Sequence, residues 1–129
     1  MTEVREVSDD KKAEEALFDL RQEYDRLEQQ DSAIKKRKKQ LSDFVTSWEQ
    51  LNKAELEILE EVSFLSQGTH SEAHALRSFD ERELVTRQGR MSIDAEFDDI
   101  EHQQRKVKNE LEEVESNLDR QKKAVYENG

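Results

Sequence analysis

The sequence predicts an all-α protein folded as a long antiparallel helical hairpin, a two-helix coiled coil. Apolar residues recur in alternating steps of three and four in two separate stretches, proline is absent from all 129 residues, and a glycine lies between the stretches. Steps of three and four place side chains on one helical face, and proline is the commonest helix breaker. Gly68, near the midpoint, is therefore the expected bend.

The two apolar stretches match each other when the chain is folded at Gly68. The first runs from Leu17 to Trp48 and the second from Ile93 to Val125. Folding places their apolar residues in pairs: Leu17 with Leu118, Tyr24 with Leu111, Ile34 with Ile100, and Leu41 with Ile93. Matched apolar positions of this kind predict a seam between two antiparallel helices.

Polar residues match across the same fold. Asp31 interrupts the first stretch at the height where Gln104 interrupts the second, and the basic run 35–39 falls opposite an acidic run over 94–101. A shared polar layer and facing charges of opposite sign specify register in coiled coils. Exposed ion pairs contribute only about 0.2–1 kcal/mol each, so they select the register more than they stabilise it.

The expected elements follow from these signals, and together they make residues 1–129 one structural unit. Residues 1–9 are expected to be frayed, 10–66 to form the first helix, 67–71 the turn and 72–126 the second helix. Ser8 or Asp9 suits the cap of the first helix, and Thr69 or Ser71 that of the second. Gly68 suits the left-handed residue that ends a helix.

The second helix is least regular in its first third. Gly89 lies inside it, where glycine costs about 1 kcal/mol relative to alanine. Ser92 could restart a helix as a cap. The sequence therefore allows a kink or short break near residues 88–92.

Composition narrows the class of partner. Charged residues make up 41% of the chain, the net charge is -11 and mean hydropathy is -1.12. So acidic a chain is disfavoured as a binder of nucleic acid or of anionic membranes. No stretch resembles a signal peptide or reaches the ~20 apolar residues of a membrane span, so a cytoplasmic protein without membrane insertion is expected.

The sequence gives little support for a catalytic function, and no enzyme, cofactor or metal is expected. His70 and His74 are four residues apart, which suits two ligands on one helical face, but no third ligand is evident and zinc needs at least three. Cysteine is absent, and no glycine-rich phosphate loop is present. Two straight helices also offer no concave site that excludes water.

A single seam leaves other apolar side chains uncovered, which is the reason to expect a protein partner. The predicted partner-binding residues beside or behind the seam are Phe18, Phe44, Leu56, Leu59 and Phe64. Trp48, the only tryptophan, fits the seam and is expected to pack under Arg87, where a cation–π contact is worth about 0.5–2 kcal/mol. Its alternative role is as an anchor for a partner helix.

Three features together resemble one group of bacterial helical proteins in layout, over residues 15–120. They are Trp48 within a long first helix, the glycine-containing turn, and the run from Phe97 to Glu101 followed by charged heptads. The group is the LXG-associated α-helical accessory proteins of the Gram-positive type VII (Ess/ESX) secretion system.

The resemblance implies a targeting factor or chaperone that binds the helical LXG domain of a cognate toxin, with or without a second small helical protein, and promotes its export. Some substrates of that system carry an aromatic-x-x-x-acid export signal. Segments of that form here are Tyr24 to Glu28, Phe79 to Glu83 and Phe97 to Glu101. The chain has no Trp-x-Gly turn, so the resemblance points to the accessory kind of protein, with co-export alongside its partner as a variant.

Two other functions compete with this one. A self-assembling coiled-coil scaffold predicts a homo-oligomer that depends on concentration. A prefoldin-like holdase predicts apolar surface near the bend, where residues 67–71 are polar.

Overall fold

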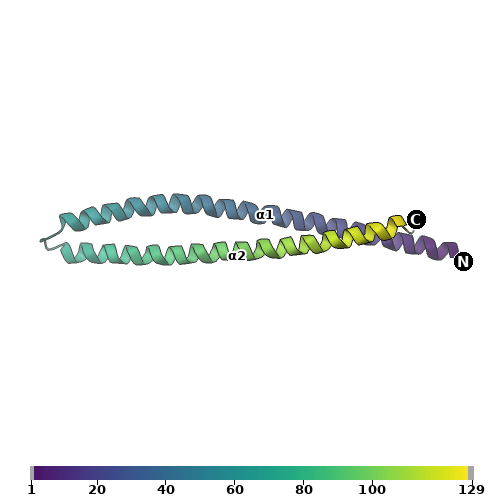
Figure 1. Cartoon of the computed structure of the whole chain (residues 1–129). Coiled ribbons are helices and arrows are strands. Elements are labelled where there is room, and N and C mark those ends of the chain that lie inside the picture. Colours follow the sequence, from purple (N-terminus) through teal and green to yellow (C-terminus); the bar gives the residue numbers. More distant parts are fainter. Residues whose placement is uncertain (1, 128–129) are drawn as a thin grey trace. The chain divides into compact units, whose positions relative to one another are not determined.

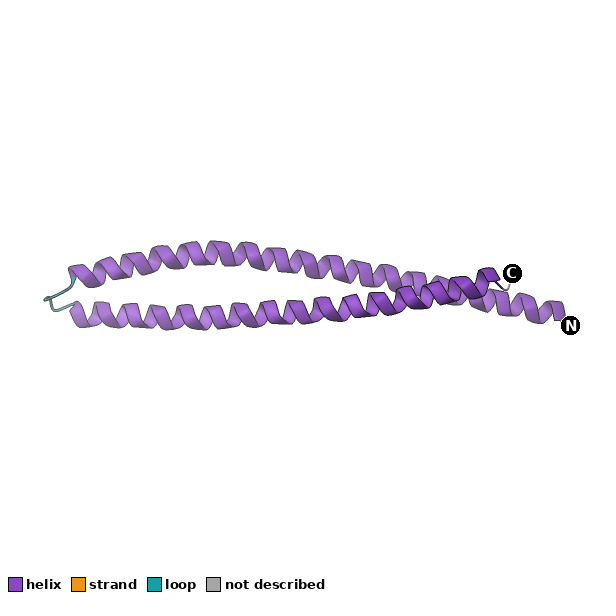
Figure 2. Cartoon of the chain, in the orientation of Figure 1, coloured by secondary structure: helices purple, strands orange, loops and turns teal. Residues whose placement is uncertain are grey.

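The structure, a computed structural model, describes the backbone of residues 2–127 and the side chains of residues 10–126. Within that range the chain is two helices, α1 (Thr2–Leu65) and α2 (Glu72–Glu127), and no strand occurs. A short turn joins them and they run in opposite directions (Figure 1). Helix accounts for the described chain apart from this turn (Figure 2). The predicted all-α helical hairpin is confirmed.

The helix ends differ in places from those expected. α1 begins at Thr2, so the described part of the segment expected to be frayed is helical, and Ser8 and Asp9 lie inside the helix rather than capping it. That segment contains neither glycine nor proline, so nothing in it stops a helix. α1 ends at Leu65, one residue before the expected end, and α2 extends to Glu127, one residue beyond it.

The turn is held by its own backbone and by two side chains. Gly68 has φ 74°, the left-handed conformation that glycine adopts without a steric penalty. The hydroxyl of Thr69 donates to the carbonyl of Ser66 at 2.7 Å, and the Gly68 N–H donates to the carboxylate of Glu72 at 3.1 Å. The carbonyl of Ser71 accepts from Ala75 N–H at 2.9 Å, which makes Ser71 the cap position of α2.

The break expected near residues 88–92 does not occur. α2 is continuous through Gly89 and Ser92. A glycine inside a helix weakens it but does not interrupt the hydrogen-bond ladder, because glycine keeps its backbone N–H.

The chain divides into two compact units, which are described separately. The terminal unit comprises Met1–Lys36 and Glu101–Gly129, and the turn unit comprises Arg37–Ile100. Each contains a segment of both helices.

Large apolar side chains fill the seam of the terminal unit. Its core is Leu17, Leu27, Val114 and Leu118, against which Leu20, Tyr24 and Leu111 pack. These residues belong to the two apolar stretches that the periodicity predicts. Asp31, expected to share a polar layer with Gln104, forms an ion pair with Lys35 on its own helix at 2.9 Å.

Tyr24 brings a hydroxyl into this seam. Its hydroxyl donates to Glu115 Oε1 at 3.2 Å across the helix pair. The carboxylates of Glu28 and Glu115 both lie within reach of this one O–H, and hydrogen bonding to them stabilises the neutral phenol, which raises the pKa of Tyr24 to about 12.

Leu27 should contribute most to the stability of the terminal unit, because its side chain is 0% exposed. We expect Leu27→Ala to lower the free energy of unfolding by about 2–5 kcal/mol, through lost burial and the cavity left behind. Phe18→Ala is the control, because Phe18 is 59% exposed and should change stability little. Urea unfolding followed by circular dichroism compares the two. Equal losses would mean that this seam does not hold the unit together.

Tyr24 should make stability depend on pH at alkaline values. Its folded pKa, about 12, lies above the ~10 of an unfolded tyrosine, so its contribution is complete below pH ~10 and is lost as pH rises through the folded pKa. In a Tyr126→Phe variant, phenolate absorbance follows Tyr24 alone. The midpoint should fall toward ~10 once urea unfolds the chain, and an unchanged midpoint would contradict the hydrogen bonds described.

Candidate partner-binding surface

Most of the fully buried side chains in the seam of the turn unit are small or polar, whereas large apolar seam residues such as Trp48 and Ile93 are only partly buried. Among the described residues of this unit, the buried side chains are Asn52, Ala75, Thr86 and Ile100. Two of these are polar and one is alanine. The terminal unit buries leucine and valine in the same type of seam, so the two units are built differently.

Trp48 and Gly89 form the largest contrast in size across this seam. A Cβ atom built on Gly89 would lie 2.8 Å from Cζ2 of Trp48, closer than side-chain carbons approach one another. The indole therefore occupies the space that any other residue at position 89 would fill. This contact is a packing reason for a glycine inside α2 despite its helix cost.

The Trp48 ring packs on Gly89, two residues further along α2 than Arg87, the neighbour expected from the sequence. Side-chain size sets this register, because the flat indole needs a partner position without a Cβ. The helix pair in the turn unit is offset from the register that counting from Gly68 predicts.

A polar layer lies beside the Trp48–Gly89 contact. The Thr86 hydroxyl donates to Asn52 Oδ1 at 2.8 Å, with the carbonyl of Arg82 2.9 Å away. The Arg82 guanidinium contacts Glu55 at 2.6 Å, and Arg82 Nε is buried without a hydrogen-bond partner. Polar groups at seam positions reduce stability and fix register.

The charge match predicted between the basic and acidic runs is present in the turn unit. Arg37 contacts Glu96 at 2.6 Å and Asp99 at 3.6 Å. All three side chains are substantially exposed, so the contacts select the register more than they stabilise the pair.

Large apolar side chains of the turn unit lie outside its seam. Four of them form a row on α1 in which successive members are seven residues, or two turns, apart, and they are 57–69% exposed. We call this row the α1 stripe; its members are Phe44, Leu51, Ile58 and Leu65. Exposed apolar residues that occur singly are ordinary, but a continuous row marks an interaction surface.

The α1 stripe runs next to the seam rather than behind it. Trp48 follows Phe44 by four residues and precedes Leu51 by three, so it lies between the stripe and the seam. Val62, 44% exposed, holds the same relation to Ile58 and Leu65. Between 44 and 65, α1 thus has apolar residues on about three positions in seven, the pattern of a helix packed against more than one neighbour.

The predicted partner-binding residues are distributed over several surfaces. Phe44 belongs to the α1 stripe and Phe64 is exposed beside Leu65. Phe18 is exposed in the terminal unit. Leu56 and Leu59 are partly buried, and Leu56 lines an open groove on the other flank of α1.

Sequence reasoning missed Leu51, Ile58, Val62 and Leu65. The signal was available, because steps of seven from Phe44 reach Leu51, Ile58 and Leu65 in turn. A second heptad row offset from the first is hard to separate from the main seam by periodicity alone.

The proposed export motif lies near the boundary of the turn unit. Phe97 is partly buried and Glu101 is exposed. Phe79 is likewise partly buried, and Tyr24 belongs to the seam of the terminal unit.

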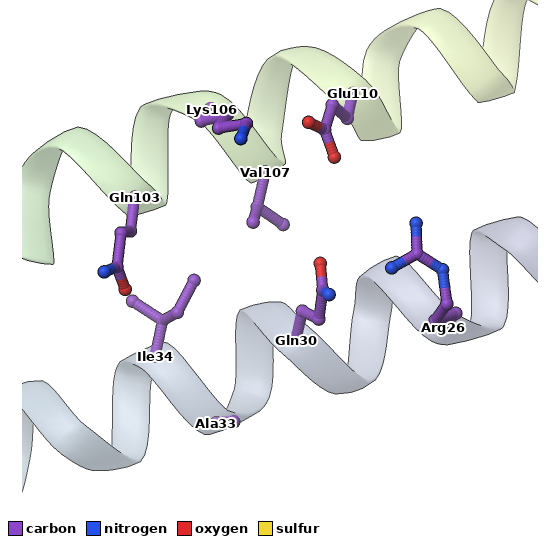
Figure 3. A pocket seen from close by; sticks show the side chains of 8 residues that line it. All are labelled: Arg26, Gln30, Ala33, Ile34, Gln103, Lys106, Val107 and Glu110. Carbon is purple, nitrogen blue, oxygen red and sulfur yellow. The ribbon is translucent and has the colours of Figure 1, made fainter.

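A polar groove crosses the terminal unit, with a volume of about 620 Å³. Figure 3 shows Gln103 and Val107 from α2, and Arg26, Gln30 and Ile34 from α1, directed toward the space between the two helices. Its lining is Arg26, Gln30, Ala33, Ile34, Gln103, Lys106, Val107 and Glu110. Charged, amide and apolar groups alternate there, with no grouping that suggests a particular ligand.

His70 and His74 are both exposed. Among the described residues, no group of three or more histidine, aspartate or glutamate side chains could hold a metal ion. Neither helix, over the same range, is long and apolar enough to cross a membrane.

No protein-family model, curated protein or solved structure matches this chain. The surfaces of the molecule therefore carry the functional argument.

The Trp48–Gly89 contact can be tested by a double-mutant cycle. Gly89→Ala gains about 1 kcal/mol of helix propensity, but overpacking against the indole costs about 1–3 kcal/mol. We expect the single variant to be less stable by about 1 kcal/mol, whereas in a Trp48→Leu background the same change should be stabilising. Urea unfolding measures both. If Gly89→Ala stabilises both backgrounds equally, the two residues are not coupled.

Proposed function

We propose that this chain is a non-enzymatic partner-binding protein whose turn unit packs along a helix of another protein and completes a helical bundle with it. The α1 stripe supports this most directly, because its four large apolar side chains are 57–69% exposed. The neighbouring seam supports it too, since Ile100 is the one large apolar side chain among its four fully buried residues, and Asn52, Ala75 and Thr86 contribute little hydrophobic stabilisation.

The partner that we propose is the helical LXG domain of a type VII secretion toxin, with this chain acting as its targeting factor or chaperone. The proposal of that particular partner depends on the resemblance in layout over residues 15–120. An elongated helical domain also suits the surface, because the α1 stripe extends over 22 residues, or about 33 Å at 1.5 Å per residue.

A holdase is the second candidate, and one observation favours it. Phe64, Leu65 and Leu76 are 49–69% exposed on either side of the turn. A holdase would use these residues for many unfolded clients, whereas the proposed chaperone would use the α1 stripe for one folded helical partner.

Co-expression with the amino-terminal domain of an LXG toxin encoded next to this chain tests the proposal. We expect the two to purify as a stable complex, and the double variant Leu51→Ser/Ile58→Ser to lose it. The matched control is Leu84→Ser/Met91→Ser, which removes two exposed apolar side chains, also seven residues apart, from α2. Recovery of only a free, folded chain would count against the LXG partner, and equal loss in both variants would count against the α1 stripe.

A further inference from the structure

The α1 stripe lies in an acidic segment of α1, and this negative charge restricts which kinds of partner can cover the stripe. Between Leu41 and Ser66, α1 contains six acidic residues and a single basic residue, Lys53. Lys53 lines the open groove on the other flank of α1, together with Glu49, Asn52, Leu56, Glu57, Glu60 and Arg90. The one positive charge of this segment is thus on the side away from the stripe.

Glu55 and Glu61 are the acidic residues that adjoin the stripe, one on each side, and Glu61 lies on the side away from the seam. Glu61 follows Ile58 by three residues and precedes Leu65 by four, so it lies on the same strip of helical surface as both. Its side chain is exposed, and no ion pair involves it among the described residues. Glu55, on the seam side of the stripe, is different because Arg82 contacts it at 2.6 Å.

Two of the three facing positions of α2 are serines, and the third is a half-exposed valine. Trp48 lies against Gly89 and Asn52 against Thr86, so the positions of α2 on the stripe side of the seam are Ser78, Val85 and Ser92. Serine side chains there leave space beside the larger residues of the stripe. A third helix could place its own apolar side chains in that space.

We propose, building on the proposed function, that the α1 stripe binds one amphipathic helix whose apolar heptad positions are flanked by lysine or arginine. Basic flanks would meet Glu61 and the acidic segment around it, while the apolar positions cover Phe44, Leu51, Ile58 and Leu65. Charges beside a heptad seam determine which helices pair.

A second copy of this chain fits the same surface less well. Paired through its own α1 stripe, it would bring another acidic segment against Glu61, and each chain carries a net charge of -11. Like charges beside a helix interface oppose pairing. The partner helix is therefore expected to come from a different chain.

Synthetic peptides test this inference on the full chain. Three labelled peptides of four heptads are compared: one with leucine at the apolar positions and lysine at the flanking ones, one with glutamate in place of lysine, and one with the lysine peptide's residues in scrambled order. Fluorescence anisotropy measures binding. We expect the lysine-flanked peptide to bind at least about tenfold more tightly than either of the others.

Matched protein variants assign the binding to this surface. Glu61→Lys should lower the affinity for the lysine-flanked peptide by about threefold, the size expected of an exposed charge contact. Glu60→Lys makes the same charge change one residue earlier, on the groove side, and should have a smaller effect. Leu51→Ser/Ile58→Ser should abolish the preference for the ordered over the scrambled peptide, and Leu84→Ser/Met91→Ser should preserve it.

The outcomes separate this inference from the proposed function. Stripe-dependent binding of the glutamate-flanked peptide at equal affinity would overturn the basic partner and leave the partner-binding function standing. If the scrambled peptide bound as tightly as the ordered lysine-flanked peptide, binding would depend on charge alone, and the inferred helix-binding site would be overturned. A concentration-dependent dimer in sedimentation that Leu51→Ser/Ile58→Ser removes would replace both proposals with self-assembly.

Discussion

Two helices in contact along one line can shield only the side chains that point between them, about two positions in every seven. The terminal unit fills those positions with residues such as Leu27 and Val114, which are buried. In the turn unit, three of the four fully buried side chains are Asn52, Ala75 and Thr86, the fourth is Ile100, and Trp48 has a glycine as its neighbour. Because the shielded line is so narrow, the large apolar residues left over in the turn unit are exposed.

This contrast links stability to association. A seam in which most of the fully buried residues are polar or small provides little hydrophobic stabilisation but restricts the register, through the bond between Thr86 and Asn52 and the contact of Arg82 with Glu55. A ligand that binds only the folded state increases stability in proportion to its affinity and concentration. A helix packed on the α1 stripe would therefore stabilise the unit that has the weaker core of its own.

The sequence predicted the hairpin well because its signals are local or strongly periodic. Heptad spacing identified the residues of the terminal core, Gly68 identified the turn, and opposed charges predicted the contacts of Arg37 with Glu96 and Asp99. The neighbour of Trp48 could not be obtained in the same way. Counting from the bend assumes a fixed register, whereas the fit of an indole on Gly89 moves the contact by two residues, about half a helical turn. Gly89 looked like a helix breaker because its role depends on the facing helix.

Trp48 also gives the molecule a natural optical probe. It is the only indole in the chain, and its ring lies against Gly89, one turn of helix from both Phe44 and Leu51. Light of a wavelength that only the indole absorbs therefore excites a residue that lies between the seam of the turn unit and the α1 stripe. Changes in emission would report events in this half of the protein directly, without an attached dye.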